Sequence, residues 1–172
     1  GTPTIAEWIG QQCKAGSEIG IDGTVSSYAE TQALIAELRR QGGMTLRLNF
    51  DPLACIWNGR PPIPQGKIEL QSLEYAGETS ASKLCRLREA LRQKHCDGML
   101  MSALDDIAWT LNLRGTDVHC NPVFVSYLVI EHEKAVLFIE ESKLTPAVSA
   151  YLESIPVALK PYEKVGNYLR KE

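Results

Sequence analysis

Residues 123–139, VFVSYLVIEHEKAVLFI, contain the two strongest strand predictions in this 172-residue chain. Residues 123–130 and 135–139 are rich in β-branched and aromatic side chains, which favour strands. The polar residues EHEK between them suit the turn of an antiparallel hairpin.

The segment before the hairpin predicts a strand followed by a helix. Residues 98–103 form a short apolar run, and the apolar residues of 104–111 recur at helical spacing. Asp105 and Asp106 fall in the first turn of that helix, where carboxylates interact favourably with the helix dipole. We prefer this role to that of a catalytic carboxylate pair. Gly115 is expected to end the helix.

A second helix is predicted between residues 80 and 97, before the apolar run. Leu84, Leu87 and Leu91 lie on one side of this helix. The opposite side, predicted to face solvent, carries Lys83, Arg86, Arg88, Arg92 and Gln93. After the hairpin, Thr145-Pro146 resembles the start of another helix, residues 157–159 a strand, and residues 162–169 a last helix.

The first fifty residues predict a β-α-β unit. Thr4 with Glu7, and Ser27 with Glu30, have the spacing of capping boxes at helix starts. Residues 18–22 and 45–50 are predicted strands. The proline-rich stretch WNGRPPIPQ, residues 57–65, cannot be helical and is interpreted as part of a linker. We therefore divide the chain at 1–73 and 74–172 and predict an α/β fold with a mixed sheet flanked by helices.

Composition excludes several classes of protein. The chain is 44% hydrophobic and 23% charged with a net charge of −3, so it has no basic footprint for nucleic acid. No apolar run is long enough to span a membrane, and no signal peptide opens the sequence. The five cysteines form no C-x-x-C pair, and we expect reduced thiols in a cytoplasmic protein. No glycine loop has the pattern that binds phosphate.

The stretch LRGTDVHCNP, residues 113–122, gathers polar residues that first suggest a metal or thiol site. Asp117, His119 and Cys120 are too few and too crowded for structural zinc, so we predict no metal ligands here. Residues 95–97 could add ligands only if the fold brought them close. Cys120 is disfavoured as a nucleophile, because adjacent side chains in extended chain point in opposite directions.

These residues also carry a resemblance to a known family. LDDIAW at 104–109, NLRGTDV at 112–118 and NPVFVSY at 121–127 resemble the second N-terminal domain of three-domain Xaa-Pro aminopeptidases (aminopeptidase P). Asp106 and Thr116 replace the Glu and Ser of that pattern. The family pattern also resembles the residues around Gly1, Trp57 and Tyr75, so the resemblance spans nearly the whole chain.

The resemblance implies a larger protein. For this chain it predicts a creatinase/prolidase N-terminal-like fold, more complete in the second domain. For the larger protein it predicts two domains of this kind, followed by a C-terminal catalytic domain. That domain would bind two divalent metal ions, with manganese expected, and hydrolyse the bond between an N-terminal residue and proline. The sequence begins at Gly1 without an initiator methionine and stops at Glu172 in the middle of a helical pattern, so we expect a fragment of this larger protein. The fragment is expected to lack the metal ligands and to be inactive alone. It is also expected to contain no cofactor and no catalytic residue of its own.

The expected role is to wall the active-site cleft and restrict its substrates to short Xaa-Pro peptides. Arg114, Asp117 and Asn121 are the candidate cleft-facing residues, with the same-chain catalytic domain as partner and a homodimer as a further possibility. In the alternative for this loop, Arg114 and Asp117 bind each other or local backbone and only hold its shape. Alternatives for the chain are a stand-alone protein-interaction module, or a creatine- or proline-dipeptide-cleaving relative.

Overall fold

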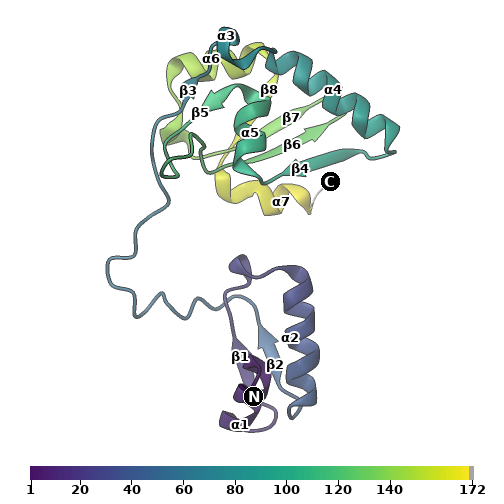
Figure 1. The fold of residues 1–172 in the computed structure, drawn as a ribbon, viewed down its shortest axis with the longest axis vertical. Helices are drawn as coiled ribbons and strands as arrows, with labels where there is room; N and C mark the ends of the chain where they lie inside the picture. The colour runs from purple at the N-terminus through teal and green to yellow at the C-terminus, as the bar shows by residue number, and fades with distance from the viewer. Residues whose placement is uncertain (171–172) are drawn as a thin grey trace. The chain divides into compact units, whose positions relative to one another are not determined.

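The computed structural model describes residues 1–170, and the chain falls into two compact units, Gly1–Pro61 and Pro62–Glu172 (Figure 1). The boundary precedes residues 62–73, which the sequence had grouped with the first unit. Ile68 explains the difference, because its side chain is fully buried in the core of the second unit. Its amide also donates to the Lys143 carbonyl at 3.0 Å.

The first unit is a β-α-β arrangement with one further helix. Its helices are α1 (Ile5–Gln12) and α2 (Tyr28–Arg40), and its strands β1 (Glu18–Gly20) and β2 (Thr45–Arg47) pair in parallel. A 3-10 helix, η1, covers Gly23–Val25. Both predicted capping boxes are confirmed, with Thr4 and Glu7 at α1 and Ser27 and Glu30 at α2. Both strands are shorter than predicted.

The second unit is built on a mixed four-stranded sheet in the order β4-β6-β7-β8. The strands are β4 (Gly98–Met101), β6 (Tyr127–Glu131), β7 (Ala135–Phe138) and β8 (Val157–Lys160). β4, β6 and β7 are antiparallel neighbours, which confirms the predicted hairpin, and β7 runs parallel to β8. The predicted mixed α/β architecture is thereby confirmed.

Helices cover both faces of this sheet. The helical segments are α3 (Leu73–Ala76), α4 (Ser80–Gln93), α5 (Leu104–Leu111), η2 (Glu141–Lys143), α6 (Pro146–Ser154), η3 (Tyr162–Lys164) and α7 (Val165–Leu169). Leu128 and Ile130 of β6 pack into the main core with α4, α5 and α6. Val129, one residue out of phase, packs on the opposite face with Val165 and Tyr168 of α7. Figure 1 shows α7 on the other side of the sheet from α4 and α6.

Two local predictions were wrong. The predicted strand 123–130 begins only at Tyr127, because the Pro122 and Val123 carbonyls and the Val125 amide bond to Gly115 and Asp117 of the preceding loop. Helix α5 is ended by Asn112 in the left-handed conformation, with φ 49°, and not by Gly115. The chain then continues as the short strand β5 (Leu113–Arg114), which pairs with β3 (Glu69–Leu70).

Gly115 is required for another reason. A Cβ at this position would lie 2.8 Å from Phe124 Cβ and 2.9 Å from the Val123 carbonyl oxygen. The glycine therefore lets the start of the 114–122 loop pack directly on the chain that leads into β6.

Candidate functional site

The loop of residues 114–122 is an irregular turnback between β5 and the chain that leads into β6. Gly115 N donates to the Pro122 carbonyl at 3.2 Å, and Asp117 N donates to Val123 O at 3.2 Å. Val118 and Asn121 form an isolated antiparallel bridge at the tip. The two arms of the loop thus supply backbone partners for each other.

Arg114 binds local backbone. Its Nη1 donates to the Leu113 carbonyl at 2.8 Å and to the Ala108 carbonyl at 3.0 Å. Ala108 lies in the last turn of α5, where its carbonyl also accepts from Asn112 N and where a cation is favourable. The guanidinium therefore ties the base of the loop to the end of α5.

Asp117 forms a buried ion pair with Lys143 of η2. The Lys143 ammonium donates to Asp117 Oδ2, and both side chains are 0% exposed. Val125 N donates to the same oxygen at 2.6 Å. The second oxygen, Oδ1, is buried and has no hydrogen-bond partner within residues 1–170. Asp117 therefore joins the loop to η2 and to the chain before β6.

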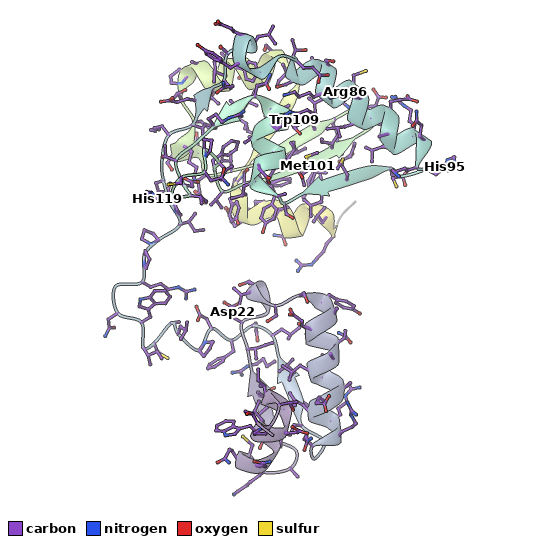
Figure 2. The ribbon with its side chains drawn as sticks, viewed as in Figure 1. Asp22, Arg86, His95, Met101, Trp109 and His119 are labelled. Carbon is purple, nitrogen blue, oxygen red and sulfur yellow. The ribbon has the colours of Figure 1, made fainter. Side chains whose placement is uncertain are left out.

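The tip of the loop is exposed. Asn121, His119 and Cys120 all face solvent, and Cys120 has a φ of 59°. Figure 2 shows His119 far from His95 on the second unit, so the fold does not bring residues 95–97 to the loop. Over the residues that the structure describes, no group of three or more His, Cys, Asp or Glu side chains is arranged to hold a metal ion.

Sequence reasoning missed two buried lysines beside this loop. Lys83, predicted to face solvent, is 1% exposed, and its ammonium donates to Asn112 Oδ1 at 2.7 Å and Trp109 O at 2.8 Å. The ammonium also lies 4.1 Å from the centroid of the Trp109 ring, and Figure 2 shows Arg86 on the neighbouring helix near this tryptophan. Lys143 likewise has no sequence signal, because its partner Asp117 is 26 residues away.

The Lys83 environment perturbs its titration. Burial lowers the pKa of the Lys83 ammonium, and Arg114 and Arg86 lower it further, while Glu78 opposes the shift. The Asn112 side chain accepts from Lys83 and donates to the Glu78 carbonyl at 2.8 Å. Lys83 and Asn112 thus close the C-terminal end of α5 with side-chain partners, as a buried helix end requires.

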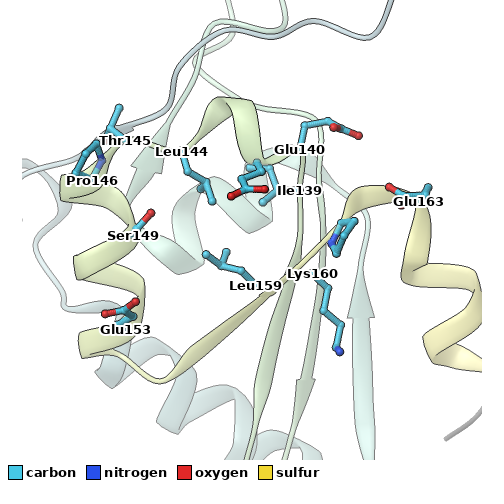
Figure 3. A pocket seen from close by; sticks show the side chains of 12 residues that line it. Ile139, Glu140, Leu144, Thr145, Pro146, Ser149, Glu153, Leu159, Lys160 and Glu163 are labelled. Atoms are coloured by element: carbon cyan, nitrogen blue, oxygen red, sulfur yellow. The ribbon is translucent and has the colours of Figure 1, made fainter.

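A groove lies between α6 and the carboxyl ends of β7 and β8 (Figure 3). Its volume is about 750 Å³. The apolar residues that line the α6–β8 groove are Ile139, Leu144, Pro146, Leu159 and Pro161. The polar residues that line it are Glu140, Glu141, Thr145, Ser149, Glu153, Lys160 and Glu163. The groove is distinct from the 114–122 loop, and the sequence did not predict it.

The second unit matches a known domain family, and the whole chain has curated relatives. The family model for the creatinase/prolidase N-terminal domain matches residues 59–172. The curated relatives include probable Xaa-Pro aminopeptidases P of Coccidioides posadasii (strain C735) and Fusarium vanettenii. Each is 37% identical over 98% of this chain, and the chain covers 26% and 28% of them, respectively.

A solved structure is also similar. The crystal structure of X-prolyl aminopeptidase from Caenorhabditis elegans, described as a cytosolic enzyme with a di-nuclear active site, matches with a TM-score of 0.84 and 30% identity. The match covers 99% of this chain and 28% of that one. The chain therefore spans about a quarter of the length of the proteins it resembles. Within residues 1–170, no helix is both long and apolar enough to cross a bilayer.

Proposed function

Because this chain belongs to the creatinase/prolidase N-terminal domain family, we propose that it is a non-catalytic N-terminal part of an Xaa-Pro aminopeptidase. Such an enzyme hydrolyses the bond between an N-terminal residue and a following proline. The observation that carries the proposal is 37% identity to a probable Xaa-Pro aminopeptidase P over 98% of the chain. We place the protein in the cytoplasm, because the similar nematode enzyme is described as cytosolic.

The chemistry would belong to a catalytic domain of the same protein. Two metal ions, with manganese expected, would activate the attacking water there. The residues that the structure describes do not fit that role, because they offer no cluster of metal-binding side chains. The contribution of this region is to narrow the approach to the active site, so that short Xaa-Pro peptides enter and longer chains are excluded. A homodimer could bring further walls to the same cleft.

The 114–122 loop is the part of the second unit that we assign to the cleft. Arg114 and Asp117 hold the loop from within, through carbonyls of α5 and through Lys143. Asn121 lies at the exposed tip, where it forms the isolated bridge with Val118. A loop that is fixed at its base and exposed at its tip suits this role, because only a rigid loop can limit the size of the peptides that enter the cleft.

The first prediction concerns peptide length. In the full-length enzyme, Asn121→Ala should raise kcat/KM for Xaa-Pro nonapeptides relative to Xaa-Pro tripeptides by about threefold, because a smaller tip opens the approach. Kinetic assays with manganese measure this ratio, and Glu133→Ala in the β6–β7 turn serves as the control. An unchanged ratio would contradict the role of this loop as a wall. A full-length protein inactive on every Xaa-Pro peptide would instead support an interaction module.

A further inference from the structure

We propose that the α6–β8 groove is a docking site for an extended basic peptide segment of a partner protein, which adds a strand to the open edge of β8. Three observations carry this inference: the free edge of β8, the apolar floor of the groove, and the unpaired carboxylates around it. It stands apart from the proposed function, because none of the residues involved belongs to the 114–122 loop.

The first observation is a sheet edge with free backbone groups. Among the described residues, β8 pairs only with β7. The Lys160 carbonyl accepts from Ile139 N at 3.0 Å and therefore faces β7. Because successive residues of a strand direct their backbone groups to alternate sides, the Leu159 amide and carbonyl face the open edge. An extended peptide can pair with such groups as an added strand.

The second observation is the apolar floor beside that edge. The Leu159 side chain lines the groove and remains 38% exposed. Leu144 and Pro146 line the same groove from the chain before α6 and from its first turn. Since side chains of a strand alternate between its two faces, every second residue of an added strand would point toward this floor.

The third observation is the charge of the rim. Glu140, Glu141 and Glu153 make no hydrogen bond or ion pair through their carboxylates within residues 1–170. Lys160 is the one cation among the lining residues. Its ammonium lies 5.8 Å from the centroid of the Tyr168 ring in α7, on the opposite face of the sheet from α6. Unpaired carboxylates around an apolar floor complement arginine or lysine side chains, whose aliphatic stems pack on apolar surface.

The alternative edge of the sheet lacks this complementarity. Among the described residues, β4 is the other edge strand of this sheet. The smaller cavity beside it, about 310 Å³, has two acidic residues, Asp97 and Glu131. Glu131 already accepts from the Tyr168 hydroxyl at 2.7 Å and pairs with Lys134. The observations therefore favour the β8 edge.

The test uses the 172-residue chain and a fluorescein-labelled peptide, Arg-Val-Arg-Val-Arg-Val, with its C-terminus amidated. We expect saturable binding by fluorescence anisotropy and about tenfold weaker binding to Glu140→Gln/Glu141→Gln/Glu153→Gln. The matched control is Glu74→Gln/Glu133→Gln/Asp106→Asn, which changes the net charge by the same amount at exposed positions away from the groove. The control is expected to bind the peptide like the unaltered chain.

A second probe isolates the strand pairing. The same peptide with alternate backbone nitrogens methylated cannot donate to an edge strand and should also bind about tenfold more weakly. Circular dichroism and thermal unfolding establish that each variant is folded. Equal weakening by the two sets of substitutions, undiminished binding of the methylated peptide, or no binding of the parent peptide would each overturn the proposal.

Discussion

At the scale of single residues, the second unit depends on charges that it has removed from water. The Asp117–Lys143 pair lies at 0% exposure and links a loop to a 3-10 helix. The Lys83 ammonium is met by a carbonyl, an amide oxygen and the face of an indole ring. Each of these lysines is stable in its site only because partners replace most of its hydration.

Removal of one partner of the ion pair should therefore be costly. We predict that Lys143→Met destabilises the second unit by about 3–5 kcal/mol, because the Asp117 carboxylate is left buried without a counter-ion. Asp117→Asn/Lys143→Met should recover part of the loss, since an amide oxygen still accepts from Val125 N. The unfolding free energies of both variants are measured by urea titration, with circular dichroism as the signal. Lys164→Met, at the exposed pair with Glu163, is the control and should change stability little.

Non-additivity decides the outcome. The test compares the change in unfolding free energy caused by Asp117→Asn in the unaltered chain with the change it causes in the Lys143→Met variant. If the two changes are equal, the two side chains are uncoupled and the ion pair does not hold the loop.

At the scale of elements, local patterns predicted much of the fold. The capping residues Thr4, Ser27 and Thr145 start helices where the sequence placed them, because these signals act within one turn. The hairpin of β6 and β7 was predicted because its two strands are joined by a short turn and are therefore close in sequence. Elements that depend on distant partners were missed: β3 and β5 are two residues each and exist only through pairing with each other.

The candidate site was harder to predict than the helices. Lys83 occupies a polar position in the pattern of α4 but points at the end of α5, so the helical wheel alone misplaced it. Asn112 could have been recognised as a helix end, since Asn tolerates the left-handed conformation better than most residues. The sequence showed no sign that Lys143 and Asp117 would meet, because only the tertiary packing of η2 on the loop joins them.

Element η3 gives a prediction about pH. The Tyr162 ring of η3 stacks on Tyr127 of β6 with centroids 5.2 Å apart. Burial, together with a hydrogen bond shared with Tyr127, raises the pKa of Tyr162 to about 12. Between pH 10 and 12 the unfolded chain therefore loses this proton while the folded chain keeps it. The contribution to stability is complete below the unfolded pKa and is lost as pH rises through this window.

Tyr162→Phe should accordingly lose less stability between pH 10 and 12 than the unaltered chain, since it keeps the ring and removes the ionisable group. Denaturant titrations at several alkaline pH values provide the measurement. Tyr75→Phe, at a side chain that is 76% exposed, is the matched control and should follow the unaltered chain. Identical alkaline profiles for all three proteins would contradict the assignment.

At the scale of the whole chain, the two units differ in the size of their cores. The first unit buries Ala6, Leu38 and Met44, whereas the main core of the second draws on β4, β6, β7, β8 and three helices. The stretch that joins them is exposed from Pro52 to Gln65. Its prolines supply no amide donors, and its backbone bonds, such as Trp57 N to Leu53 O at 2.9 Å, are local turns within residues 51–60.

Limited proteolysis tests this division. Thermolysin should cleave first near Leu53 or Ile56, which are 43% and 69% exposed. The fragment that contains the second unit should then resist further digestion and keep a cooperative thermal transition, because its core is independent of the first unit. Mass spectrometry of the early products identifies the sites. Initial cuts within residues 80–160 would contradict the two-unit description.

The late position of β8 in the chain has a consequence for truncated forms of the protein. All four residues of β7 are buried, and one edge of this strand is covered only by β8, which follows it after α6. A released chain that ends before Val157 would display β7 as an uncharged apolar edge, open to pairing with other chains. Nonsense changes between residues 139 and 156 should therefore yield aggregates rather than a smaller folded protein.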